Sequence, residues 1–137
     1  MSQTFTSLYV HLVWSVAGRQ PLLTPDVARL VYRQLVSKCA DLRSSAIAVG
    51  GVEDHVHVLV RLATTVSVAT LAHDLKGSSS HFFNHILMPG SQFRWQGGYG
   101  AFSVSVRGVE AVTAYVRDQH RHHAEGSIAQ ALERTID

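Results

Sequence analysis

Hydrophobic and polar residues alternate in several short stretches of the chain, with the two-residue period of a half-buried β-strand. The clearest case is the run containing Val56, Val58 and Val60, where every second residue is a valine. A turn is expected just before this run, through Gly50–Gly51 and Glu53–Asp54. Strands are therefore predicted at 4–16, 45–49, 55–62, 93–95 and 101–105.

Other segments carry apolar residues three and four positions apart, the spacing of one face of an α-helix. The first helix is expected to begin at Thr24–Pro25–Asp26, because Thr is a favoured N-cap and Pro a favoured first residue, and to reach about Cys39. The second spans 67–88, but residues 77–80 (Gly-Ser-Ser-Ser) are poor helix formers, so we expect a strained or ligand-facing turn there. A third helix is predicted over 109–123.

The predicted order of elements is β-α-β-β-α-β followed by a further helix. This order is typical of the α+β ferredoxin-like (RRM-like) fold, an antiparallel sheet with two helices on one face and its first and third strands at the centre. We predict a single domain over 1–137, comprising a ferredoxin-like core at 1–108 and a helix at 109–123. A capping box predicts a short last helix within 127–137.

Composition narrows the class of protein further. Of 137 residues, 46% are hydrophobic and 16% are charged, so the chain can bury a full core. No apolar run approaches the ~20 residues of a membrane span, and the first residues lack the features of a signal peptide. The single Cys39 cannot form an internal disulfide, so a cytoplasmic protein is expected. A net charge of +2 with a pI near 9 permits nucleic-acid binding without requiring it.

Two histidines stand out within the valine strand. His55 and His57 are two residues apart, so their side chains are predicted to lie on one face of the strand, opposite the valines. Two imidazoles held in this way can share a metal ion, each through a neutral ring nitrogen. For the isolated pair, two strand histidines bonded to water or to neighbouring residues are an equal alternative.

The helix over 109–123 carries a second candidate group. Tyr115 and Gln119 are four residues apart and therefore neighbours on one helical face. Taken alone, this pair is also compatible with an ordinary amphipathic helix that has a tyrosine at the edge of the core and a solvated glutamine.

In combination, these motifs resemble a known family. The segments EDHVHVLV, WQGGYGAFSVS and YVRDQHRHH, together with HLVWSVAGRQPLL near the start and LKGSSS in the second helix, are similar to the single-tyrosine HUH transposases of the insertion sequence 200/605 type and to the related transposases associated with repetitive extragenic palindromes. The resemblance covers essentially the whole chain. One departure is Val16–Ala17–Gly18, where a more basic segment is expected, and it concerns DNA contact rather than chemistry.

The resemblance implies a transposase that cleaves and rejoins hairpin single-stranded DNA at element ends. Tyr115 would be the nucleophile, forming a 5′-phosphotyrosine intermediate and releasing a 3′-hydroxyl. His55, His57 and Gln119 would hold a divalent metal, with Mg²⁺ favoured and Mn²⁺ as a substitute, although two imidazoles and an amide by themselves would suit Mn, Co or Zn. The family implies a homodimer with active sites completed in trans, associated with the nucleoid.

Several further residues are candidates for DNA contact. Basic, hydroxyl and aromatic side chains could bind the DNA backbone or stack on unpaired bases; the candidates are Arg19, Lys76, Ser79, Arg94 and Tyr99. A solvated helix face is an equal alternative for Lys76 and the serines. Core packing is favoured for Trp95 and Phe102, and His11 could support the site from the first strand.

Two other classes of function remain open at this point. A ferredoxin-like sheet can be a non-catalytic nucleic-acid-binding module, although the first and third strands lack a matching aromatic pattern. The site could also be a metal-dependent phosphoesterase that releases its products by hydrolysis. Only the transposase requires Tyr115 as a nucleophile.

Overall fold

The computed structural model describes residues 3–119, 121, 123 and 133. Its centre is a four-stranded antiparallel sheet in the order β2-β3-β1-β4. The strands are β1 (Tyr9–Ser15), β2 (Ser45–Val52), β3 (His55–Arg61) and β4 (Gly100–Val104). The predicted ferredoxin-like arrangement is confirmed, and β1 and β3 occupy the centre of the sheet as expected.

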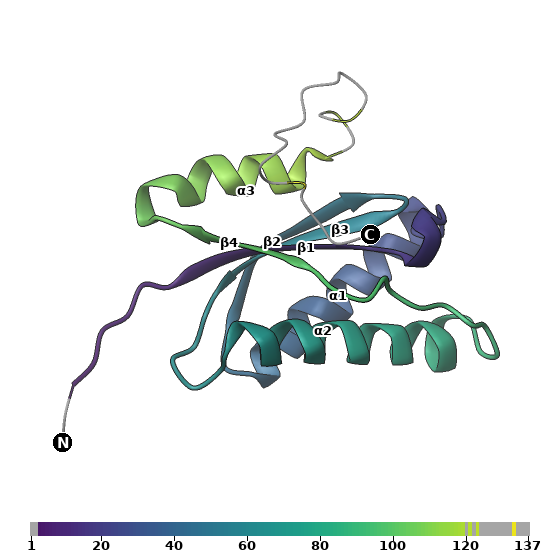
Figure 1. Cartoon of the computed structure of the whole chain (residues 1–137), viewed down its shortest axis with the longest axis horizontal. Coiled ribbons are helices and arrows are strands. Elements are labelled where there is room, and N and C mark those ends of the chain that lie inside the picture. Colours follow the sequence, from purple (N-terminus) through teal and green to yellow (C-terminus); the bar gives the residue numbers. More distant parts are fainter. Residues whose placement is uncertain (1–2, 120, 122, 124–132, 134–137) are drawn as a thin grey trace.

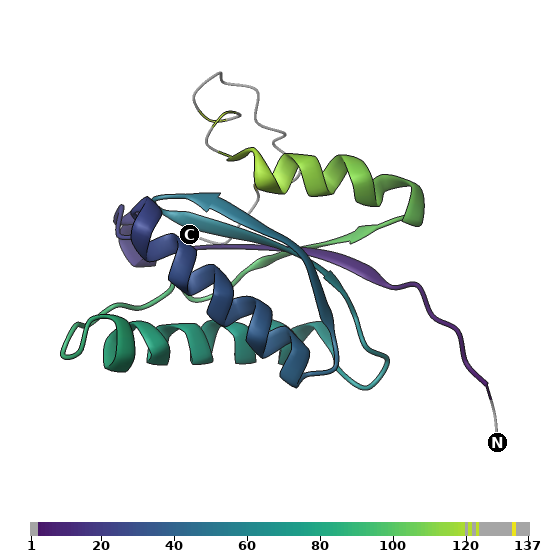
Figure 2. The ribbon, with the colours of Figure 1, turned by 180° about the vertical axis from the view of Figure 1, so that it is seen from behind.

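The helices form a layer on each side of the sheet (Figure 1). Helices α1 (Pro25–Asp41) and α2 (Val68–Phe82) cover one face, and α3 (Val109–Arg117) lies across the other. The view from behind shows the same three layers, with α1 crossing in front of α2 (Figure 2). The described part of the chain contains no helix that could span a membrane.

The two-residue period of the central strands produces a separate core on each face. Leu12 and Trp14 of β1 and the valines of β3 are buried beneath α1 and α2, where they form the main hydrophobic cluster. On the opposite face Leu59 packs with Ala48 of β2 and Val116 of α3. The histidines of β1 and β3 occupy the alternate positions and therefore share the face that carries α3.

Two strand boundaries differ from the sequence prediction. β1 begins at Tyr9 rather than at residue 4, and Phe5 is 85% exposed because no strand of the described residues pairs with this part of the chain. β2 continues through Gly50 and Gly51, which pair with β3, so the turn consists of Glu53–Asp54 alone. The glycines mark a close approach of backbones, not a turn.

The strained or ligand-facing turn expected within the second helix is not seen. Residues 77–80 are regular helix, and the Ser79 hydroxyl donates to the carbonyl oxygen of Leu75 at 2.7 Å. The same hydroxyl accepts a hydrogen bond from the indole nitrogen of Trp95 at 2.8 Å. Tertiary contacts therefore override the poor helix propensity of this stretch. The irregular turn comes later, where residues 83–87 form a π-helical segment.

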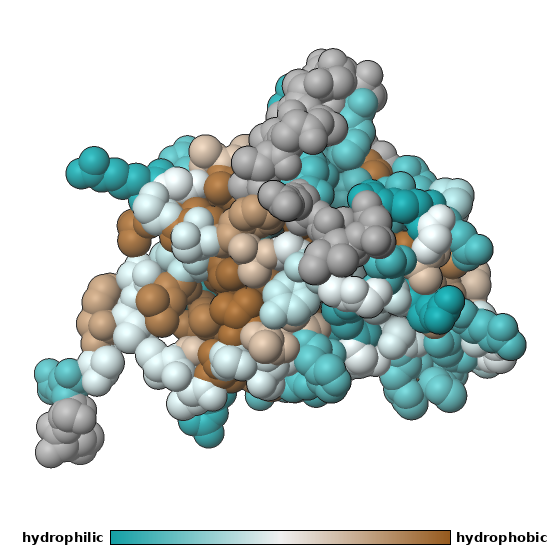
Figure 3. Space-filling view, viewed as in Figure 1, coloured by the Kyte–Doolittle hydropathy of each residue, from teal (hydrophilic) through white to brown (hydrophobic). Residues whose placement is uncertain are grey.

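The segment between α2 and β4 packs mainly through its aromatic side chains. The strand expected at 93–95 is reduced to one bridge between Val16 and Trp95. Trp95 is buried and meets Trp14 edge to face at 5.8 Å, which confirms its predicted core position. At the β4 edge of the sheet, apolar side chains of the first part of β1 and of β4 line an open groove. The space-filling view shows hydrophobic residues gathered over this region (Figure 3).

The C-terminal region is described only in part. α3 ends at Arg117, six residues before the predicted end, because Asp118 departs from helical geometry; Gln119 is again helical. The predicted last helix lies outside the described residues, apart from Glu133.

Candidate active site

The two histidines of β3 lie side by side on the face of the sheet that carries α3. His55 pairs with Ser15 of β1 and His57 with Val13, and their ring centroids are 5.1 Å apart. Both side chains are almost completely buried, at 3% and 0% exposure. The paired geometry predicted from their spacing is thus present, on a central strand that is hydrogen-bonded on both sides.

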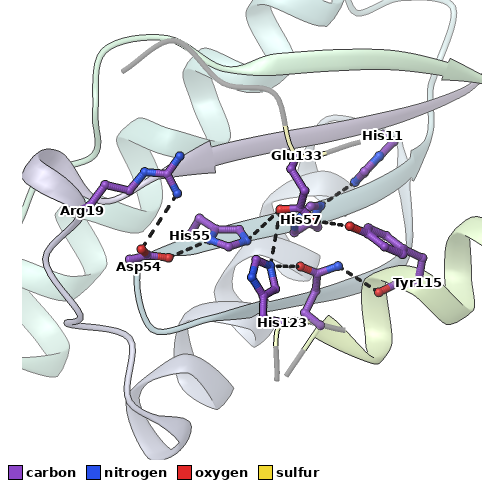
Figure 4. A network of polar contacts seen from close by, with 9 residues as sticks. His11, Arg19, Asp54, His55, His57, Tyr115, His123 and Glu133 are labelled. Carbon is purple, nitrogen blue, oxygen red and sulfur yellow. Dashed lines mark hydrogen bonds and ion pairs between the residues drawn. The ribbon is translucent and has the colours of Figure 1, made fainter. Parts of the chain in front are cut away.

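Each imidazole is held in place through its Nδ1 atom. His55 Nδ1 lies 2.7 Å from Oδ1 of Asp54, whose other oxygen is 3.9 Å from the Arg19 guanidinium. His57 Nδ1 lies 2.8 Å from Nε2 of His11, and these two rings are stacked with centroids 5.0 Å apart. With both Nδ1 atoms engaged, the Nε2 atoms face the site (Figure 4).

Helix α3 brings Tyr115 to these imidazoles within the same chain. Val116 is fully buried against Ala48 and Leu59, which seats the helix on the sheet. A Cβ at Gly50 would lie 1.9 Å from the Val116 carbonyl oxygen, so only glycine permits this close approach. Tyr115, the preceding residue, is 8% exposed, with its ring centroid 6.0 Å from that of His57.

The structure adds a carboxylate that sequence reasoning missed. Oε1 of Glu133 lies 3.1 Å from Nε2 of His57 and 3.1 Å from Nε2 of His55, while Oε2 accepts a hydrogen bond from the Tyr115 hydroxyl. His123 Nε2 is 3.5 Å from Oε1. Glu133 is 76 residues from His57 in the sequence, and no local pattern marks an acidic residue near the C-terminus as a partner of a distant strand.

Gln119 is fully buried close to this group. Its amide nitrogen donates to the Tyr115 carbonyl oxygen at 3.0 Å, and its Oε1 lies 3.2 Å from Nε2 of His123. His123 in turn lies beside His55, with ring centroids 4.9 Å apart and the rings tilted by 58°. The contacts of Gln119 therefore reach the histidine pair through His123, and its predicted role as a metal ligand stays a prediction.

Burial and the carboxylates shift the ionisation of the cluster. Burial lowers the pKa of His57, and burial together with His57 lowers the pKa of His11 to about 3. Burial alone would lower the pKa of His55, but Glu133 and Asp54 outweigh it and raise that pKa. Burial alone would raise the pKa of Glu133, but its contacts with His55 and His57 hold it well below its usual range.

The donor set fits a divalent metal. One ligand atom from each of His55, His57 and Glu133 lies within 4.8 Å of the others. His55 Nε2 is buried and lies 3.1 Å from Oε1 of Glu133, and this contact is not counted among the hydrogen bonds of the described residues. A buried nitrogen lone pair aimed at a neighbouring imidazole and a carboxylate suits a cation. The donors are mixed nitrogen and oxygen, so they do not select one metal.

The five residues predicted to contact DNA are not brought together. Arg19 lies beside the site through Asp54, and Arg94 is exposed beside an open pocket that Ala17 and Gly18 also line. Lys76 donates to the carbonyl oxygens of Gln96 and Gly98 at 2.7 and 2.8 Å, and so it fastens that loop.

The remaining two candidates are directed into the protein. Ser79 is fully buried, so its hydroxyl is not accessible to DNA in this structure. Tyr99 is partly buried and packs against the main core.

Comparison with known proteins identifies both the fold and the family of this chain. A solved structure of a protein from Deinococcus radiodurans R1, assigned as a transposase, is 20% identical, with a TM-score of 0.67 over 87% of this chain and 98% of that one. A transposase solved bound to a REP hairpin, a REP-associated tyrosine transposase, is 12% identical, with a TM-score of 0.63 over 100% of this chain and 93% of that one. At these identities the likeness establishes the fold alone.

The chain belongs to the family described as IS200-like transposases, whose family model matches residues 4–119. The matched residues include His55, His57, Tyr115 and Gln119, whereas Glu133 lies beyond them. No curated protein matches the chain.

Proposed function

We propose that this transposase cleaves and rejoins single-stranded DNA by transesterification, with Tyr115 as the nucleophile. The observation that carries the proposal is the position of the Tyr115 hydroxyl, which donates to the same carboxylate that contacts Nε2 of His55 and of His57. The phenol of Tyr115 and the imidazoles of His55 and His57 thus all contact the carboxylate of Glu133. A solvated tyrosine at the edge of a core would not require this convergence.

The chemistry exchanges one phosphate ester for another. The Tyr115 oxygen attacks the phosphorus as its proton leaves, the bond between phosphorus and the 3′-oxygen breaks, and the 3′-oxygen takes up a proton. The product is a 5′-phosphotyrosine ester, which a 3′-hydroxyl can attack in the reverse reaction. Because the bond energy stays in the ester, rejoining needs no ATP.

The chain's own residues position the reacting groups. The packing of Val116 fixes the direction from which Tyr115 approaches, and the partners of the Nδ1 atoms fix both imidazoles. We propose that His55 and His57 hold a divalent metal together with oxygen donors from Gln119 and Glu133. The expected metal is Mg²⁺, for which Mn²⁺ can substitute. When bound, the metal supplies charge neutralisation for the phosphate and the leaving oxygen.

Glu133 is a poor candidate for the general base. A general base works best when its pKa lies near the working pH, whereas the pKa of Glu133 is held well below its usual range. We therefore assign it the roles of orienting the phenol and supplying a metal ligand. The tyrosine proton is transferred to solvent or to the DNA.

The proposed partner is hairpin single-stranded DNA at the ends of a mobile element. Family membership supports a DNA substrate, and one structural neighbour was solved with a REP hairpin. A homodimer with sites completed in trans stays a prediction from the family. In this chain Tyr115 already lies beside the histidines of its own sheet.

A covalent-adduct assay tests the proposal. The protein is incubated with Mg²⁺ or Mn²⁺ and a labelled library of hairpin oligonucleotides with randomised flanks, and protein–DNA adducts are separated on denaturing gels. Wild type should form an adduct, Tyr115→Phe and His57→Ala should form none, and Tyr9→Phe should match wild type because Tyr9 lies outside the site.

Other outcomes identify other functions. An adduct that persists in Tyr115→Phe would move the nucleophile elsewhere. Cleavage without an adduct would indicate a phosphoesterase, and binding without cleavage would indicate a nucleic-acid-binding module.

A further inference from the structure

A histidine outside the proposed ligand set is in direct contact with it. His11 lies on β1 opposite Leu59, so it is the diagonal neighbour of His57 on the same face of the sheet. It is fully buried, its Nε2 atom is 2.8 Å from Nδ1 of His57, and the two rings are nearly parallel with an interplanar angle of 17°. The register of the sheet places His11 next to His57, and the bond reaches His57 at Nδ1, the ring nitrogen that does not face the proposed metal site.

The hydrogen bond between His11 Nε2 and His57 Nδ1 contains one proton. Whether that proton is on His11 or on His57 determines whether Nε2 of His57 carries a proton or a lone pair. If His57 carries its proton on Nε2, that atom donates to Glu133 at 3.1 Å, and Nδ1 accepts from His11. If His57 carries its proton on Nδ1, it donates to His11, and the Nε2 lone pair is free for a metal. Only the second arrangement makes His57 a metal ligand.

Nothing else among the described residues competes for His11. Its own Nδ1 atom has no hydrogen-bond partner in the described part of the chain, and its other ring contact is with Phe102 at 5.8 Å. A buried imidazole costs free energy in an apolar position, which a phenylalanine of similar shape would fill without that cost. The hydrogen bond to His57 is therefore the interaction for which a histidine is needed at position 11.

We propose that His11 is a positioning residue that selects the tautomer of His57: its Nε2 accepts a hydrogen bond from Nδ1–H of His57, so that the Nε2 lone pair of His57 is available to a metal. This inference rests on the proposed metal-dependent function. On metal binding, the proton shared by the pair passes from His11 Nε2 to His57 Nδ1. His57 releases its Nε2 proton and His11 takes one up on Nδ1, so the proton count of the pair is unchanged.

Direct metal binding to the full chain, without DNA, tests the proposal. Free Mn²⁺ is measured by electron paramagnetic resonance during titration of wild type, His11→Phe, His11→Gln and the exposed control His73→Gln. His11→Phe should weaken Mn²⁺ binding about 10- to 100-fold, the usual effect of losing a group that orients a ligand. His11→Gln should stay within about threefold of wild type because its amide oxygen can accept a hydrogen bond from Nδ1–H of His57.

A spectroscopic measurement separates this role from general packing. In ¹⁵N-histidine-labelled protein, long-range ¹H–¹⁵N spectra report which nitrogen of His57 is protonated. Addition of Mg²⁺ to wild type should move the proton from Nε2 to Nδ1, and the same addition to His11→Phe should leave a mixture of both tautomers. A purely structural histidine would change the melting temperature without changing this response.

The outcomes distinguish the two levels of the proposal. If wild type binds no Mn²⁺, the metal-dependent function fails and the role of His11 fails with it. If wild type binds and His11→Phe binds equally well, only the role of His11 is overturned. Should His11→Phe fail to fold, the comparison of His11→Gln with His11→Leu replaces it, and equal affinity of these two variants overturns the proposal.

Discussion

At the scale of single residues, the site depends on one carboxylate that serves several partners. Glu133 contacts both imidazoles and accepts from the tyrosine, and its pKa is held well below its usual range by the histidines. An ionised carboxylate oxygen is among the ligands that hard divalent cations prefer. In the proposed reaction, a DNA phosphate would have to enter the space beside the phenol that Glu133 occupies.

Removing the charge of Glu133 should weaken metal binding. Glu133→Gln is expected to lower Mn²⁺ affinity about tenfold, because it removes the only carboxylate grouped with the two histidines among the described residues. Titration calorimetry measures the effect, with Glu110→Gln in the first turn of α3 as the control. Unchanged affinity would remove Glu133 from the ligand set and leave Gln119 as the remaining oxygen donor.

The residue scale also separates what sequence can and cannot predict. His55 and His57 are two apart on one strand, so their shared face follows from the period of the strand alone. Glu133 meets them from 76 residues away, and that proximity depends on how the whole chain folds. Local periodicity carries no information on such a contact, which is why the strand ligands were predictable and the carboxylate was not.

At the scale of elements, glycines in β2 decide how closely the tyrosine helix approaches the sheet. The sequence suggested a turn at Gly50–Gly51, because glycine pairs are frequent in turns. In the structure both residues are inside the strand, and Gly50 leaves room for the backbone of Val116. The sequence alone does not distinguish a glycine required because another backbone packs closely against it from a glycine required by the conformation of a turn.

A methyl group at Gly50 should displace the tyrosine helix. Gly50→Ala places Cβ 1.9 Å from the Val116 carbonyl oxygen, so we expect a loss of about 1–3 kcal/mol in unfolding free energy and at least a tenfold loss of adduct formation. Urea denaturation and the adduct assay measure the two effects.

Gly77→Ala in α2 is the matched control. A Cβ at Gly77 meets nothing within 4 Å, so this change should stabilise the protein by up to about 1 kcal/mol. Full activity of Gly50→Ala would contradict the close docking of α3.

The regular course of α2 through its serines depends on tertiary contacts. Ser79→Ala removes the acceptor of the Trp95 indole and should cost about 1–3 kcal/mol in unfolding free energy, because the buried N–H is left unpaired. Ser80→Ala, whose hydroxyl bonds only within the helix, should change it by less than about 0.5 kcal/mol. Equal effects of the two substitutions would argue against the role of the Trp95 contact.

At the scale of the whole molecule, the proposed active site is assembled from segments far apart in one chain. β1 supplies His11, β3 supplies the histidine pair and α3 supplies the tyrosine. The fold class could be predicted from the sequence, because the order of predicted strands and helices is compatible with few topologies. The side of the sheet on which α3 docks could not be predicted, since it depends on the second apolar cluster of Ala48, Leu59 and Val116.

Mixing two inactive variants tests whether each chain completes its own site. His57→Ala and Tyr115→Phe are combined and assayed for the covalent adduct. Because Tyr115 lies beside His57 of its own chain, we expect the mixture to stay inactive. Recovery of activity in the mixture would mean that the tyrosine of one copy serves the histidines of another, which is the dimer that the family predicts.

The two halves of the site belong to elements of unequal stability. The imidazoles are carried by the central strands, whose amides are paired on both sides, whereas the phenol is carried by a nine-residue helix seated through one small apolar cluster. Local opening free energies follow such differences, so amide protons of α3 should exchange with solvent before those of β1 and β3. On warming, strand-transfer activity should therefore decline while the metal-binding half of the protein is still intact.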